Sequence, residues 1–377
     1  MSGESKSVTP EMFASWNETT LPTLLSNYGL KDIYNADEFG LFYQCLPDKS
    51  YQLKSEKCSG GKHSKIRITG LAAANAVGDK LPMFVIGKAR NPRCFKNVKK
   101  LPCRYRAQKK SWMDSILFEE WVREINKMFQ AEERNVLLIV DNCPAHPTIE
   151  GLSNLKLIFL PPNTTSVTQP MDQGVIRCLK AHYRKRLVKL ILCNLDSNKP
   201  LPKISLITAL QLLVSAWNEV SKATIVNCFR KSKISEKDQK NAVNDEDDPF
   251  KEMSEELQNL REKDSSLVPE NLTAEDFASM DDVVVSTASH LTDNEILLEA
   301  LQLDTNEEED ILDDDEELET PNKTDVEASL QILKNLSLFS EKRGNQMQDL
   351  ISKFETLLLQ EKLEKCKQAV IPDFFKK

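Results

Sequence analysis

Short runs of apolar residues predict the strands of a β-sheet in the first half of the chain. Two neighbouring runs are separated by the turn-like tripeptide Val77-Gly78-Asp79, which suggests a meander. A later run is continuously apolar, as is typical of a central parallel strand. The predicted strands cover residues 33–36, 65–74, 81–86, 136–140 and 155–160.

Apolar residues at helical spacing predict helices between and after these strands. One helix is expected over 115–130, and a long basic amphipathic helix is expected from near Asp172 to about Cys193. The expected order is three strands, helix, strand, helix, strand, helix. This order predicts an α/β fold in which helices flank a mixed sheet.

The pattern changes in the C-terminal third. Between Asp304 and Glu319, 11 of 16 residues are Asp or Glu, which predicts an acidic, disordered linker over 235–325. A tail over 326–377 follows. Its apolar residues form one helical stripe, which needs a partner such as a second copy of helix 347–358. The stripe consists of Met347, Leu350, Ile351, Phe354, Leu357 and Leu358.

The net charge of −8 conceals two halves of opposite sign. Residues 1–234 carry 35 Lys and Arg against 20 Asp and Glu, whereas 235–377 carry 15 against 38, so the net charges are +15 and −23. A basic globular half favours a phosphate-backbone partner such as DNA, although basic residues also simply solvate a surface. One face of the predicted basic helix is a candidate for contact with the DNA backbone: Lys180, Arg184, Lys185, Arg186 and Lys189.

Cysteine spacing and the N-terminal sequence exclude several classes of protein. The nine cysteines are scattered, odd in number and form no Cys-x-x-Cys pair, so a disulfide framework and a zinc module are not expected. The N-terminus has no signal-peptide pattern, and no apolar run is long enough to cross a membrane. A soluble, intracellular protein is therefore expected.

Three aspartates lie at the boundaries of predicted elements. Asp37 follows the first strand, Asp141 ends the central strand, and Asp172 starts the basic helix. Converging carboxylates supply the hard oxygen ligands that Mg²⁺ prefers, and two such ions can support phosphoryl transfer. An aspartate at a strand end or a helix cap is more often structural, so the flanking residues must decide between the two interpretations.

The flanking residues resemble the DDE endonuclease domain of pogo and Tigger transposases, to which centromere protein B and the jerky proteins are similar. The resemblance covers about residues 20–232, with 30 residues between Asp141 and Asp172. The matching strings are Asn35-Ala36-Asp37-Glu38-Phe39-Gly40-Leu41-Phe42, Val140-Asp141-Asn142-Cys143-Pro144-Ala145-His146, Pro161-Pro162-Asn163-Thr164-Thr165-Ser166 and Gln169-Pro170-Met171-Asp172-Gln173-Gly174-Val175-Ile176.

The resemblance implies an RNase H-like domain over 33–234 that cuts and transfers DNA strands. It implies two Mg²⁺ ions, with Mn²⁺ as a substitute. Asp37, Asp141 and Asp172 would be the catalytic metal ligands, and Asn142 and His146 would be supporting residues. A nuclear protein is expected.

Two departures from the family pattern leave the function open between two hypotheses. Phe39 stands where the family usually has Thr or Ser, and residues 1–32 match only the remnant of a connecting segment, without the helix-turn-helix reader. One hypothesis is a metal-dependent transposase-type endonuclease. The other is a domesticated, non-catalytic nuclear protein that interacts with DNA or chromatin.

The last ten residues resemble the peptide by which replication and repair proteins bind the sliding clamp. The pattern is a glutamine, an aliphatic residue and two aromatic residues, carried here by Gln368, Ile371, Phe374 and Phe375. These apolar side chains can form a short plug for a pocket, or they can fold back onto the core. The sliding clamp is therefore a candidate partner.

Overall fold

The computed structural model describes most of the chain, in two units that are treated separately below. The first unit ends at Glu317 and the second begins at Leu318. The described residues are 16, 18, 21–47, 66–161, 164, 168–235, 248–282, 320–340 and 343–365. The candidate clamp peptide and most of the acidic stretch around residue 310 lie outside the described residues.

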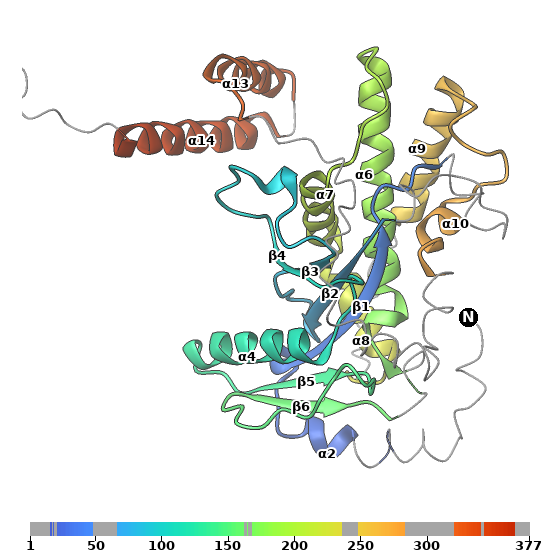
Figure 1. Ribbon diagram of the computed structural model, residues 1–377, viewed down its shortest axis with the longest axis vertical. Coiled ribbons are helices and arrows are strands. Elements are labelled where there is room, and N and C mark those ends of the chain that lie inside the picture. The colour runs from blue at the N-terminus through green and yellow to red at the C-terminus, as the bar shows by residue number, and fades with distance from the viewer. Residues whose placement is uncertain are drawn as a thin grey trace, which may run out of the picture. The chain divides into compact units, whose positions relative to one another are not determined.

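The first unit is built on a six-stranded mixed sheet with the order β4-β3-β2-β1-β5-β6 (Figure 1). Only β2 runs against the others, because it pairs antiparallel with β1 and β3, whereas β1 with β5, β5 with β6 and β3 with β4 are parallel. The strands are β1 (Ile33–Phe42), β2 (Arg67–Asn75), β3 (Phe84–Gly87), β4 (Arg104–Ala107), β5 (Val136–Val140) and β6 (Leu155–Phe159).

Helices cover both faces of this sheet, as its two apolar faces require. On one face, α4 (Ser115–Ala131) packs its apolar side against Tyr34 and Leu138. On the other face, Ile33 and Leu137 belong to a larger core with the remaining helices. Those helices include α6 (Ile176–Asp196), α7 (Leu206–Glu219) and α8 (Lys222–Lys231).

This sheet confirms the expected mixed α/β class, and its strand order and directions are those of an RNase H-like fold. The five predicted strands are present, and β1 is longer than predicted because Phe39, Leu41 and Phe42 are also buried. The helix expected between β5 and β6 is wrong, since residues 141–154 form turns and irregular backbone. β4, α7 and α8 were not predicted.

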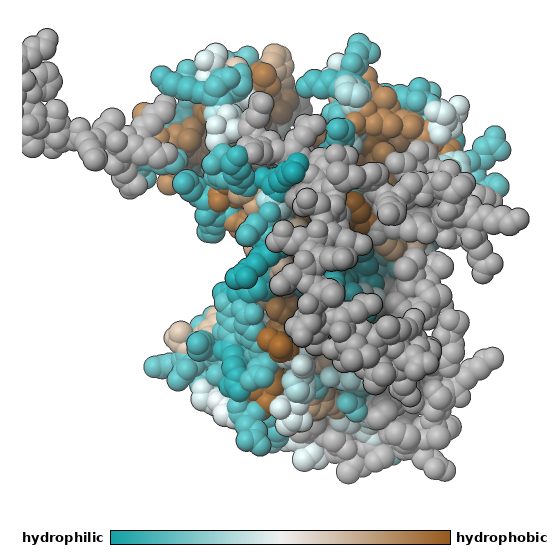
Figure 2. Space-filling view, viewed as in Figure 1, coloured by the Kyte–Doolittle hydropathy of each residue, from teal (hydrophilic) through white to brown (hydrophobic). Residues whose placement is uncertain are grey.

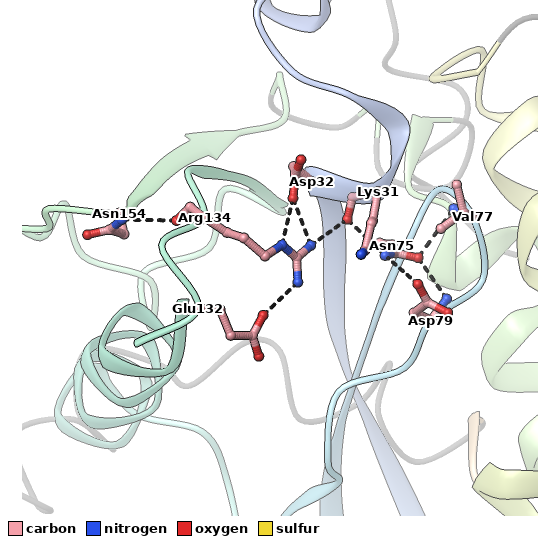
Figure 3. A network of polar contacts seen from close by, with 8 residues as sticks. All are labelled: Lys31, Asp32, Asn75, Val77, Asp79, Glu132, Arg134 and Asn154. Atoms are coloured by element: carbon pink, nitrogen blue, oxygen red, sulfur yellow. Dashed lines mark hydrogen bonds and ion pairs between the residues drawn. The ribbon is translucent and has the colours of Figure 1, made fainter. Parts of the chain in front are cut away.

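A polar network closes the end of the sheet at which β1 begins (Figure 3). Arg134 donates to Asp32 and to the carbonyl of Lys31, at 2.9 Å each. Asn75 also donates to the carbonyl of Lys31, at 2.8 Å, and accepts from the backbone N–H of Asp79 at 2.7 Å. These bonds tie β1, β2 and the start of β5 together, leaving the opposite end of the sheet for chemistry.

The expected disordered linker over 235–325 is wrong for residues 248–282. This segment contains the helices α9 (Pro249–Lys263) and α10 (Ala274–Ser279), and both pack against α6 (Figure 1). Charge counting missed an apolar stripe within the acidic sequence. The stripe lies on α9 at helical spacing and consists of Met253, Leu257 and Leu260, which are almost fully buried. Phe277 on α10 is also fully buried.

Shorter elements complete the first unit. They are α2 (Leu21–Leu25), the 3₁₀ turns η3 (Leu30–Asp32) and η5 (Arg93–Phe95), and the π-helical turn η6 (Met171–Val175). Gly174 within η6 has a φ of 144°, a backbone conformation that favours glycine, and this allows the chain to turn sharply into α6.

The second unit is a helical hairpin of α13 (Lys323–Leu338) and α14 (Gly344–Lys365). The predicted stripe over 347–358 does lie on a helix, and its Ile351 is buried. Most apolar side chains of the hairpin remain exposed within the described residues. Among them are Ile332, Leu336, Leu338, Phe339, Leu350, Phe354, Leu357 and Leu359. No helix in the described ranges is long and apolar enough to span a membrane.

Candidate active site

The three candidate aspartates come from three segments that meet at one place on the sheet. β1 and β5 are parallel, and Asn35 is opposite Ile139. Two residues further along each strand, Asp37 and Asp141 are therefore level with each other. Asp172 lies in η6, which contacts β1 and leads directly into α6. The structure thus brings the predicted triad together.

Asn35 holds these three segments in position. Its side chain is fully buried and donates from Nδ2 to the carbonyl of Ile139 at 2.9 Å. Its Oδ1 accepts from the backbone N–H of Met171, also at 2.9 Å. Because Ile139 precedes Asp141 by two residues and Met171 precedes Asp172 by one, a single amide links all three aspartate-bearing segments.

The carboxylates crowd one another strongly. Burial raises the pKa of Asp37 well above its usual value, and the nearby charges of Asp172, Glu38 and Asp141 raise it further. A hydrogen bond between the side chains of Asp37 and Asp172 acts in the same direction. Carboxylates that share a site cannot all ionise easily unless a positive charge lies between them. This electrostatic arrangement favours the binding of a cation.

His146 bridges two of these carboxylates from the α4 side of the sheet. Its Nε2 lies 3.1 Å from Glu38 Oε1, and its Nδ1 lies 2.7 Å from Asp141 Oδ1. Burial alone lowers the pKa of His146, but the contacts with Asp141, Cys143 and Glu38 outweigh it and hold the pKa far above its usual value. The ring stacks on Phe118 with centroids 4.0 Å apart. A charged imidazolium therefore fixes the orientation of Asp141.

The donor set fits a hard divalent cation. Asp141 Oδ1 is buried and accepts no well-aligned hydrogen bond within the described part of the chain, so a ligand position is available there. Asp141, Cys143 and His146 also have ligand atoms within 4.8 Å of one another. That mixed set would suit a softer metal. Both ring nitrogens of His146 already lie within about 3.1 Å of carboxylate oxygens, however, so the aspartate oxygens are the better ligands.

Phe39 lies in the core. It is opposite Gly70 across the β1–β2 pair, and a Cβ at Gly70 would lie only 2.4 Å from the Phe39 ring. The ring therefore occupies the space that glycine leaves. The side chain is 4% exposed, so this departure from the family pattern is accommodated by packing.

Contact with the DNA backbone was expected for five basic residues on one face of α6. Three of these residues are buried, so the expectation is wrong for them. Arg184 is fully buried and forms a two-pronged ion pair with Asp281, at 2.8 and 3.0 Å. Lys180 pairs with Asp282 at 2.5 Å, and Lys185 is also buried.

The acidic segment that follows the domain core covers this face. Glu252 on α9 lies 2.7 Å from the Lys185 ammonium group. Arg186 pairs with Glu219 on α7 at 2.6 Å, and Lys189 lies 3.4 Å from Glu256 on α9. Arg186 and Lys189 remain partly exposed. The positive charge on α6 is thus largely neutralised within the chain.

The resemblance did not assign roles to Asn35 and Glu38, although both stand in its first motif. Asn35 and Asp37 lie on the same face of β1, because strand side chains alternate. The two-residue spacing between Asn35 and Asp37 could therefore have identified Asn35 as a residue of the site. Asn142 is exposed and makes no hydrogen bond or ion pair with the described residues, so its supporting role stays a prediction.

Comparison with known proteins shows that part of this chain matches the model of a protein family. Residues 65–229 match the model of the DDE superfamily endonuclease family. The match begins after β1, so the structure rather than this match places Asp37 in the site. The matched residues run from β2 into α8 of the fold described above.

The chain is similar to proteins derived from transposable elements. It is 40% identical over 218 residues to Tigger transposable element-derived protein 4 of Mus musculus, covering 58% of this chain and 42% of that protein. It is 33% identical over 223 residues to the jerky protein homolog of Homo sapiens, covering 55% and 38%. The chain therefore spans under half the length of these relatives.

More distant similarities were also found. The chain is 30% identical over 217 residues to major centromere autoantigen B of Homo sapiens, covering 56% of this chain and 35% of that protein. Among solved structures, the catalytic domain of Mos1 mariner transposase matches at 10% identity with a TM-score of 0.34, covering 60% of this chain and 90% of that chain.

Proposed function

We propose that this chain is a metal-dependent DNA endonuclease of the transposase type that cleaves and transfers DNA strands in the nucleus. The observation that carries the proposal is the meeting of Asp37, Asp141 and Asp172, from three separate segments, in one cluster whose carboxylates raise the pKa of Asp37. A purely structural cluster of like charges would destabilise the fold without benefit.

The three aspartates are proposed to hold two Mg²⁺ ions, for which Mn²⁺ would substitute. When bound, such ions supply activation of the attacking oxygen and neutralisation of the leaving oxygen in phosphoryl transfer. Asp37 and Asp141 lie level on parallel strands, so they can present oxygens to a shared position. Asp172 approaches from η6 and completes the ligand set.

The surrounding residues orient these ligands. His146 lies within ion-pair distance of Asp141 and Glu38, Asn35 fixes the segments, and Asn142 stays a candidate for supporting the substrate. Ligand orientation of this kind typically changes metal affinity about 10- to 100-fold.

Several further assignments belong to the same proposal. DNA is the proposed substrate, and 33–234 is the proposed catalytic region, with α9 and α10 as part of its fold. The exposed apolar residues of α14 fit self-association through 347–358. The sliding clamp, through Gln368, Ile371, Phe374 and Phe375, stays a proposed partner on sequence alone.

A non-catalytic role in binding DNA or chromatin is the second candidate. The observation that favours it is the pairing of the α6 face with the chain's own acidic segment, which leaves Lys180, Arg184 and Lys185 buried in ion pairs. Retention of all three aspartates favours the endonuclease instead.

A nicking assay on supercoiled DNA separates the two candidates. The purified full chain should nick DNA with Mg²⁺ or Mn²⁺ and lose this activity in Asp141→Asn, which keeps the side-chain shape. Asp196→Asn is the matched control, because Asp196 is the exposed last residue of α6 and its ion pair among the described residues is with Lys263. Equal nicking by the parent and Asp141→Asn, or none by the parent, would overturn the proposed activity.

A further inference from the structure

Residues 88–110 form a strongly basic segment that the proposed active site does not use. They include ten Lys and Arg and no Asp or Glu. The segment leaves β3 after Gly87, passes through η5 and contains β4. Figure 2 shows hydrophilic residues gathered over the region of β4 and α4. The exposed basic residues are Lys88, Arg90, Arg93, Lys96, Lys99, Lys100, Arg104, Lys109 and Lys110.

Buried contacts hold this segment in a defined conformation. Cys94 is fully buried, and the rings of Phe95 and Tyr105 meet edge to face with centroids 5.0 Å apart. The Tyr105 hydroxyl donates to the carbonyl of Ala89 at 2.7 Å. A Cβ at Gly87 would lie 2.3 Å from the Tyr105 oxygen, so the tyrosine packs directly on this glycine. The basic side chains are thus displayed by an ordered scaffold.

Acidic neighbours neutralise only part of the segment. Arg104 pairs with Glu124 on α4, and Arg106 pairs with Glu120. Lys88, Arg90 and Lys109 form no ion pair or hydrogen bond with the described residues, and all three are exposed. We call these three residues the basic rim.

The basic rim follows the C-terminal ends of β3 and β4, at the same end of the sheet at which β5 ends before Asp141. β3 and β4 run parallel to β1, and Ile86 is level with Gly40 through Thr69. Met83 on the β3 side is therefore level with Asp37, and Lys88 lies five residues further in the direction of β1. β3 is two strands away from β1 in the sheet. With about 3.3 Å per residue and about 4.8 Å per strand, the backbone separation is roughly 20 Å.

That separation suits DNA bound across this end of the sheet. Along duplex DNA the phosphates of one strand advance by about 3.4 Å of helix axis per nucleotide, so a phosphate roughly six nucleotides from one at the carboxylates would reach the rim. The rim retains its free charge, whereas the basic residues of α6 are largely paired with acidic groups of this chain.

We infer that the basic rim binds the phosphate backbone of the DNA on which the carboxylates act, an inference that rests on the proposed function. Lysine and arginine contacts with phosphates fix the position of DNA without reading its sequence. The rim would therefore set where the strand lies relative to Asp37 and Asp141, with no preference for base sequence.

The test measures DNA affinity of the full chain against salt concentration, in chelator so that cleavage does not occur. Each phosphate contact contributes about 0.9 to the slope of log affinity against log salt. The triple variant Lys88→Ser, Arg90→Ser, Lys109→Ser should lower this slope by about 2 to 3 and weaken binding at least tenfold at low salt.

The charge-matched control is Lys127→Ser, Lys156→Ser, Lys199→Ser. These lysines are exposed and lie in the second half of α4, at the start of β6 and beyond the end of α6, so none of them belongs to the segment that carries the rim. The control should retain most of the parent slope. Equal slopes for the two triple variants, or no DNA binding by the parent, would overturn the inference. Failure of the proposed endonuclease would appear separately, as rim-dependent binding without nicking in Mg²⁺ or Mn²⁺.

Discussion

The side-chain oxygen of Asn35 accepts a hydrogen bond from the backbone N–H of Met171 at 2.9 Å, which fixes η6 against β1. The other end of the same amide donates to the carbonyl of Ile139 on β5. Met171 immediately precedes the candidate ligand Asp172, and Ile139 precedes Asp141 by two residues. The geometry of the carboxylate cluster therefore depends on one buried amide.

Replacing Asn35 with Ala should reduce divalent-ion affinity about 10- to 100-fold, because Asp172 would no longer be held toward Asp37. Leaving two buried backbone groups unpaired also costs roughly 1–3 kcal/mol of stability for each. Mn²⁺ binding by calorimetry and thermal unfolding would measure both effects. Asn126→Ala is the control, since Asn126 is buried and accepts from the backbone N–H of Asn154, away from the site. Equal Mn²⁺ affinity in the two variants would contradict a positioning role for Asn35.

Replacing Asp37 with Asn should stabilise the metal-free protein, because it removes one charge from a crowded cluster in which the pKa of Asp37 is raised. The same change should remove most of the rise in melting temperature that Mn²⁺ gives the parent. Calorimetric melting with and without Mn²⁺ measures both. A metal-free variant that melts below the parent, while keeping the full response to Mn²⁺, would show that Asp37 is structural.

Asp281→Ala should destabilise the first unit by about 3–5 kcal/mol, because it leaves the Arg184 charge buried without its partner. Glu262→Ala on α9 is the control in the same acidic segment. Its side chain is exposed and accepts a hydrogen bond from the exposed Gln258, so a change below about 1 kcal/mol is expected. Denaturant unfolding of the full chain compares them. Similar losses in the two variants would mean that the acidic segment does not form part of the folded core.

The pH dependence of stability should include a contribution from His182 on α6. Burial, followed by the nearby charge of Lys185, lowers the pKa of His182 below its usual value near 6.5. A lowered pKa in the folded state means that the unfolded chain takes up the proton first. Stability from this group is therefore present above pH 6.5 and lost as the pH falls below it. Imidazole NMR should show the His182 midpoint below 6.5, and His182→Gln should flatten the acid side of the stability curve. A midpoint above 6.5 would contradict this.

The sequence predicted those parts of the site that depend on local pattern. Asp37 and Asp141 follow apolar runs that form adjacent parallel strands, although Asp37 lies within β1 and not at its end as predicted. Asp172 was placed by its motif, and the π-helical turn that presents it depends on Gly174. The apolar runs likewise predicted the central strands.

Other features depend on long-range pairing that no local pattern shows. Arg184 and Asp281 are 97 residues apart, and each alone resembles an ordinary surface charge. The acidic segment was predicted as disordered because its charge obscured Met253 and Leu257. The β4 strand is short and rich in arginine, so its apolar signal was weak.

Anomalous diffraction from crystals of the full chain soaked in Mn²⁺ tests the central claim most directly. The account predicts anomalous peaks between the carboxylates of Asp37, Asp141 and Asp172, and their loss in Asp141→Asn. Two peaks about 4 Å apart would fit the two-ion proposal. A peak held by Cys143 and His146 instead, or no peak within reach of the three aspartates, would contradict it.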